Sequence, residues 1–114
     1  MRGLAPLLLA AVLAALPAAA QERVGVRVGK HPTHGRVVFD WPRAVDYRVE
    51  EAEGRVRLRF AAPAEFDLGQ AAGRPPRNVR SLSAEGSVAE IGIAPGARTR
   101  HFRLGNRVVV DLLD

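Results

Sequence analysis

Apolar and polar residues alternate along most of the chain after residue 20. The stretch VGVRV at residues 24–28 and the stretch RVRLRF at residues 55–60 both place an apolar residue at every second position. Because successive side chains of a strand point to opposite faces of a sheet, this alternation predicts strands with one buried face. No stretch beyond residue 20 has the apolar spacing of an amphipathic helix. The sequence therefore predicts an all-β protein.

Turn-forming residues divide this part of the chain into short strands. Pairs such as Glu53-Gly54, Glu85-Gly86 and Gly105-Asn106 are typical of tight turns. They predict eight strands, near residues 23–29, 36–41, 45–52, 55–61, 77–83, 87–94, 98–104 and 107–113. Short strands at such regular intervals favour a sandwich or a barrel. The segment 62–76, which ends with two prolines, is then the one long connection.

That connection divides the domain into two similar halves. Each half reads as a strand, a turn, a strand that ends in an apolar or aromatic residue and proline, a third strand, a tight turn and a fourth strand. A unit that cannot bury its own apolar face is stabilised by packing on a second copy. We therefore expect a β-sandwich of two related four-stranded halves that arose by internal duplication. The apolar residues expected in its core are Val24, Val26, Val38, Val56, Leu58, Phe60, Ile91, Ile93, Phe102, Val108 and Val110.

One phrase of five residues occurs in both halves. Arg36–Asp40 reads RVVFD and Arg107–Asp111 reads RVVVD, so an arginine, three apolar residues and an aspartate are written twice. The apolar residues fit the core of a sheet, while the charged ends could pair across neighbouring strands or face a ligand. Pairing is favoured for both aspartates, since cross-strand charge pairs are common in sheets.

The first 20 residues have the layout of a secretory signal peptide. Arg2 carries a positive charge, Leu4–Leu16 is an apolar run, and Ala18–Ala20 forms a small-residue cleavage site. The run is shorter than the roughly 20 apolar residues that span a bilayer, which favours cleavage over a membrane anchor. The chain has no cysteine, so it has neither a disulfide nor a cysteine for lipid attachment. We expect a periplasmic domain at residues 21–114, without stable membrane insertion after cleavage.

The charge of the chain suggests anionic partners. Its formal net charge is +5, and removal of Arg2 leaves about +4. A basic protein outside the cytoplasm can bind cell-wall polymers, lipid headgroups or polysaccharides. Nucleic acid is not expected, because the signal peptide directs the chain away from it and aromatic stacking motifs are lacking. The alternative is a compositional origin: all but one of the 17 cationic residues are arginine, and a GC-rich genome favours Arg, Ala, Gly and Pro without selection for binding.

The sequence offers few groups for catalysis. It has no cysteine nucleophile, and none of its serines lies in a G-x-S-x-G motif. His31 and His34 provide two candidate metal ligands, whereas a zinc site needs three or four. We therefore expect no enzymatic activity, no metal and no cofactor.

A row of arginines in the stretch RVRLRF is a candidate binding feature. Arg55, Arg57 and Arg59 would lie on one face of a strand, about 7 Å apart. Guanidinium groups bind carboxylates and phosphates in a bidentate manner. The favoured alternative is that these arginines pair with the glutamates of the preceding stretch Glu50–Glu53.

Three short motifs make the chain resemble the AMIN domain, which precedes periplasmic N-acetylmuramoyl-L-alanine amidases and type IV pilus secretins. The motifs are Arg36–Asp40, Val45–Val49 and Arg107–Leu112, and the resemblance extends over residues 24–113. It implies a non-catalytic β-sandwich of two related halves, with similar motifs on both outer faces. The implied role is to bind peptidoglycan and to place an attached domain at the wall or division site. No amidase or secretin sequence follows within this chain, so it is a stand-alone member or the N-terminal part of a longer protein.

Charge and resemblance together indicate a non-enzymatic periplasmic module for peptidoglycan binding and protein targeting. Another anionic envelope polymer is a related ligand, and the alternative function is an assembly domain that docks an envelope protein through an exposed strand edge. The expected ligand-binding residues are Arg36, Asp40, Arg57, Arg59, Arg107 and Asp111. Arg36 and Arg107 should be exposed, and Arg57 and Arg59 should extend the same basic surface.

Overall fold

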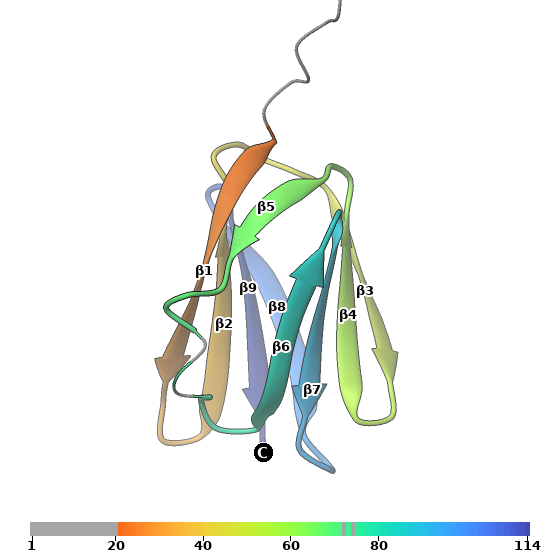
Figure 1. Cartoon of the computed structure of the whole chain (residues 1–114). Helices are drawn as coiled ribbons and strands as arrows, with labels where there is room; N and C mark the ends of the chain where they lie inside the picture. The colour runs from red at the N-terminus through yellow and green to blue at the C-terminus, as the bar shows by residue number, and fades with distance from the viewer. Residues whose placement is uncertain (1–20, 72, 74) are drawn as a thin grey trace, which may run out of the picture.

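The computed structural model describes residues 21–71, 73 and 75–114, which form nine strands (Figure 1). The strands are β1 (Glu22–Lys30), β2 (His34–Asp40), β3 (Tyr47–Ala52), β4 (Arg55–Phe60), β5 (Ala64–Asp67), β6 (Val79–Glu85), β7 (Val88–Ile93), β8 (Arg98–Leu104) and β9 (Arg107–Leu113). Within the described ranges there is no helix long and apolar enough to cross a membrane. The expected signal peptide at residues 1–20 lies outside these ranges.

The strands form two sheets that pack face to face, so the expected β-sandwich is confirmed (Figure 1). One sheet has five strands in the order β5-β1-β2-β9-β8, and the other has four in the order β3-β4-β7-β6. Neighbouring strands are antiparallel except β1 and β5, which are parallel.

The strand order has the symmetry expected of a duplication. Each half of the chain contributes one hairpin to each sheet: β1–β2 and β8–β9 to the larger sheet, β3–β4 and β6–β7 to the smaller. Replacing each strand by its counterpart in the other half turns the order β1-β2-β9-β8 into β6-β7-β4-β3, which is the smaller sheet read backwards. The two halves are therefore related, but they interleave rather than forming one sheet each.

The ninth strand, β5, lies in the segment 62–76, which we expected to be a long connection between strands. That expectation is wrong because four residues are too few for a visible alternation, although Ala64 and Phe66 do face the core. The ring of Phe66 packs against Phe39, Trp41 and Phe60, with ring centroids 5.7 to 6.2 Å apart. Aromatic packing thus accounts for the position of β5 beside β1.

The core between the sheets consists mainly of the inward-facing apolar residues of β1, β2, β4, β7 and β9. Two expected core residues, Val38 and Phe102, lie instead on the outer face of the five-stranded sheet. β2 contains three successive apolar residues, and the outer two, Val37 and Phe39, are fully buried between the sheets. Val38 must therefore point outward, because neighbouring side chains of a strand alternate. The partner of Phe102 on β9 is Val109, which faces outward as well.

Candidate functional site

The two copies of the repeated phrase lie side by side at the centre of the five-stranded sheet. β2 and β9 pair antiparallel, so Arg36 is opposite Asp111 and Asp40 is opposite Arg107. An antiparallel pair of R-x-x-x-D phrases thus matches each arginine with the aspartate of the other copy. All four charged residues therefore pair across neighbouring strands, as the sequence favoured for the two aspartates.

Alternate residues of these strands and their neighbours form the outer face of the sheet. We call the central part of this surface, around the two phrases, the basic face, and it comprises Arg27 of β1; His34, Arg36, Val38 and Asp40 of β2; Arg100, Phe102 and Leu104 of β8; and Arg107, Val109 and Asp111 of β9. Four arginines and two aspartates stand on it together. They are grouped into two clusters at opposite ends of an apolar strip.

The first cluster surrounds Asp111, whose side chain is fully buried. Arg36 donates from Nε to Oδ1 over 2.7 Å, and Arg100 donates from Nη2 to Oδ2 over 2.6 Å. His34 Nε2 lies 3.8 Å from Oδ2. Burial raises the pKa of the Asp111 carboxyl, but the hydrogen bonds from Arg36 and Arg100 outweigh this effect and leave the pKa below its usual value. Asp111 is therefore an ionised group that fixes two guanidinium groups at the surface.

The second cluster surrounds Asp40, which is about one-third exposed. Arg27 donates to both carboxylate oxygens, with a distance of 2.9 Å from Nη2 to Oδ1. Arg107 Nε lies 3.3 Å from Oδ1. The Arg27 hydrogen bond lowers the pKa of Asp40. The clusters are four positions apart along either strand, a distance of about 13 Å.

Both clusters carry more positive than negative charge. Each has two arginines and one aspartate, so each keeps a formal charge of +1 when His34 is neutral. The arginine side chains are 37% to 58% exposed, and a guanidinium has five N–H donors. Two shallow hollows meet at Arg27, Leu104 and Arg107. The surplus donors can therefore receive an anionic ligand.

An apolar strip separates the two clusters. Val38 lies opposite Val109, and Val109 lies opposite Phe102 on its other side. The guanidinium of Arg36 stands 5.4 Å from the centroid of the Phe102 ring. Leu104, opposite Arg107 at the end of the strip, is 53% exposed, and no other large apolar side chain of the described residues is exposed to that degree. Val109 is only 1% exposed, so the nonpolar contact between the two cationic sites comes from the partly exposed Val38 and Phe102.

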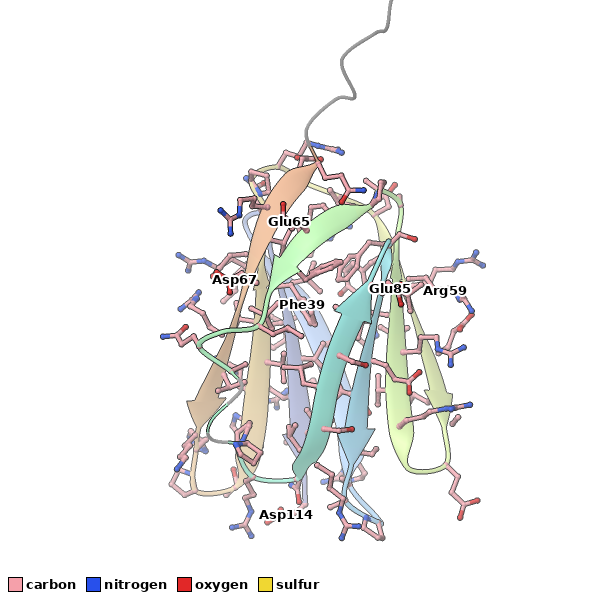
Figure 2. All side chains as sticks on the ribbon, in the orientation of Figure 1. Phe39, Arg59, Glu65, Asp67, Glu85 and Asp114 are labelled. Atoms are coloured by element: carbon pink, nitrogen blue, oxygen red, sulfur yellow. The ribbon has the colours of Figure 1, made fainter. Side chains whose placement is uncertain are left out.

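The arginines of β4 occupy the opposite outer face of the sandwich. Figure 2 shows Arg59 projecting from the side of β3 and β4, with Phe39 between the two sheets. Arg57 Nη2 donates to Glu90 over 2.9 Å, and Arg59 Nε donates to Glu50 over 2.9 Å. Arg57 and Arg59 therefore do not extend the surface of Arg36 and Arg107, and that expectation is wrong because β4 belongs to the other sheet. The expected partner stretch contributes Glu50, while Arg57 uses a glutamate of β7.

Two arginines of the basic face, Arg27 and Arg100, were missed by the sequence analysis. Arg27 lies on the polar side of the alternating strand β1, whereas Arg100 shares its side of β8 with Phe102, which was expected in the core. Neither side was recognisable as part of this surface without the strand order. β1 flanks β2 and β8 flanks β9, so each outer strand adds one arginine to the neighbouring aspartate.

His31 lies in the turn after β1, and His34 is the first residue of β2. The rings of His31 and His34 stack with centroids 4.2 Å apart. Among the residues that the structure describes, no group of three or more His, Cys, Asp or Glu side chains could hold a metal ion.

Comparison of the chain with protein-family models, with curated proteins and with solved structures gave no match. A function for the chain therefore rests on the geometry of the basic face.

Proposed function

We propose that the chain is a non-enzymatic module that binds an anionic polymer of the cell envelope, peptidoglycan in the first place, through the basic face. The observation that carries this proposal is the ratio of two arginines to one carboxylate in each cluster. Guanidinium groups form charge-assisted, bidentate hydrogen bonds with carboxylates, which peptidoglycan carries on its peptides. The resemblance to the AMIN domain supports the same ligand, and a targeting role follows if a further domain is attached.

The opposite face of the sandwich has a lower ratio of arginines to carboxylates in its ion pairs. Arg57 and Arg59 each donate to a glutamate of their own sheet, and Arg55 lies 4.0 Å from Glu90, so three arginines there share two carboxylates. On the basic face, four arginines share two carboxylates. We propose that binding uses the basic face alone, in contrast to the two similar faces that the resemblance implies.

Retention on purified peptidoglycan tests this function. The chain from Gln21 to Asp114 should be retained, and retention should weaken as salt is added, because exposed charges are screened. Changing Arg100→Gln and Arg107→Gln together should weaken binding roughly tenfold, as expected for the loss of two exposed charge contacts. Arg36 is left unchanged so that buried Asp111 keeps a partner.

The matched control for this test is on the other face. Arg55→Gln with Arg59→Gln removes the same charge, and both side chains are about half exposed. We expect this variant to be retained like the wild type. Equal losses in the two variants would mean that net charge rather than the basic face determines binding. No retention of the wild type would reject the proposal and favour docking of an envelope protein through a strand edge.

The proposed export to the periplasm can be tested separately. We propose that residues 1–20 direct export to the periplasm and are then removed, because charge, apolar run and small residues occur in the order of a signal peptide. N-terminal sequencing of the exported protein should begin at or near Gln21. Recovery of intact Met1 in the membrane fraction would instead indicate an anchor.

A further inference from the structure

We infer that the basic face holds two similar carboxylate subsites and recognises an extended ligand whose carboxylates stand about 13 Å apart, joined by a segment with a nonpolar face. This inference rests on the proposed function, since it specifies the ligand of the same surface. Three observations support it: the spacing of the clusters, their similar composition, and the apolar strip between them.

The spacing is set by the register of the two phrases. β2 and β9 are paired residue for residue from His34 to Asp40, without a bulge. The Asp111 cluster and the Asp40 cluster are therefore held at opposite ends of one rigid strand pair. A line between them runs along the strands, so a ligand that contacts both must lie parallel to β2 and β9.

The two clusters have the same composition of one aspartate and two arginines, although the flanking arginines differ in register, because Arg100 is opposite Asp111 and Arg27 is opposite Val38. Each joins an aspartate of one central strand to an arginine of the other central strand and to a second arginine of the flanking outer strand. The antiparallel pairing relates them by an approximate two-fold axis through the pair of Val38 and Val109. A ligand with the same anionic group at both contact points fits such a surface, as a polymer with repeated units does.

The bonds to aspartate leave part of each guanidinium for a ligand. Arg36, Arg100 and Arg27 all contact their aspartate through Nε and Nη2, and Nη1 takes no part in these bonds. The carboxylates restrict the guanidinium orientations before a ligand arrives, which reduces the entropy lost on binding. The partly exposed side chains of Val38 and Phe102 then favour a nonpolar segment between the two anions.

A pair of small dicarboxylates tests the spacing directly. Extended dodecanedioate places its carboxylates at about the distance between the clusters, with a nonpolar chain between them, whereas succinate is too short to reach both. We expect dodecanedioate to bind the chain from Gln21 to Asp114 at least tenfold more tightly than succinate, because its second contact is intramolecular. In an NMR titration at low salt, it should shift the backbone amides of Arg107 and Asp111 at the same ligand concentration.

Removing one cluster provides the decisive variant. Arg27→Gln with Arg107→Gln should reduce the affinity for dodecanedioate to that for succinate, while succinate still shifts the amide of Asp111. Arg100→Gln tests the other cluster in the same way, and unchanged dispersion of the NMR spectrum shows that each variant is folded. Equal affinities of the wild type for both probes would overturn the two-subsite inference, even if peptidoglycan is retained. A preserved preference for dodecanedioate without peptidoglycan retention would support the subsites and reject only the proposed polymer.

Discussion

Replacing Asp111 with alanine should lower the free energy of unfolding by about 3 kcal/mol at neutral pH, the low end for removing one partner of a buried ion pair. The Asp111 side chain is fully buried, and Arg36, Arg100 and His34 all lie within 4 Å of its carboxylate. Its removal leaves the two guanidinium groups and the imidazole without the carboxylate that they contact, around an unfilled space. The low end applies because the two arginines can turn toward water, being 37% and 52% exposed. Urea unfolding of residues 21–114, followed by circular dichroism, measures the change.

Asp40→Ala is the matched control for this prediction. It removes the same residue type from the other copy of the phrase, but the Asp40 side chain is 32% exposed. We expect a loss of under about 1 kcal/mol, as for exposed ion pairs. Equal losses at the two positions would show that burial of Asp111 does not determine its contribution.

The stabilising effect of Asp111 should also depend on pH in a defined direction. Its pKa is lower in the folded protein than the ordinary value of about 3.9. A carboxyl group with a depressed pKa stabilises the folded state fully above the unfolded pKa, and this contribution is lost as the pH falls through the folded value. The difference in stability between wild type and Asp111→Ala should therefore be constant near neutral pH and shrink below about pH 4.

The fold was predictable because the alternation of apolar residues is regular in most strands. The stretches at 24–28 and 55–60 define their buried faces without ambiguity, and Val24, Val26, Val56, Leu58 and Phe60 are buried as expected. The same reasoning failed at Val38, where three successive apolar residues fit either register. It also failed for β5, because a four-residue strand is positioned by its contacts with distant aromatic rings rather than by its own pattern.

The binding surface was only partly predictable, because alternation assigns a residue to one side of its strand but does not identify the neighbouring strand. Cross-strand pairing was foreseen for Asp40 and Asp111, yet the bond from Arg36 to Asp111 joins residues 75 positions apart. Arg57 and Arg59 have the pattern of binding residues, and they were assigned to the wrong surface because β4 enters the other sheet. The strand order depends on packing of the whole core, and it determines which charged side chains come into contact.

Gly35, the residue before the first phrase, should be the other position with a large effect on stability. A Cβ atom at Gly35 would lie 2.0 Å from the carbonyl oxygen of Arg77, and the backbone N and C of Arg77 would also be within 3.1 Å. The chain at Arg77 cannot move away easily, because Asn78 Nδ2 donates to the Leu112 carbonyl over 3.0 Å. Gly35→Ala should therefore lower the free energy of unfolding by about 2 to 3 kcal/mol, as overpacking of a close contact does.

Gly29→Ala is the control, because this glycine is also in a strand of the same sheet but has room beside it. The nearest atom to an added Cβ is the Cβ of Arg36, at 3.9 Å, which is an ordinary van der Waals distance. We expect a change within about 0.5 kcal/mol, as for surface substitutions without strain. Urea unfolding midpoints of the two variants make the comparison. A similar small change for Gly35→Ala would mean that the segment before β6 can move away from β2. In that case the short distance between position 35 and the backbone of Arg77 would not be the reason for glycine at this position.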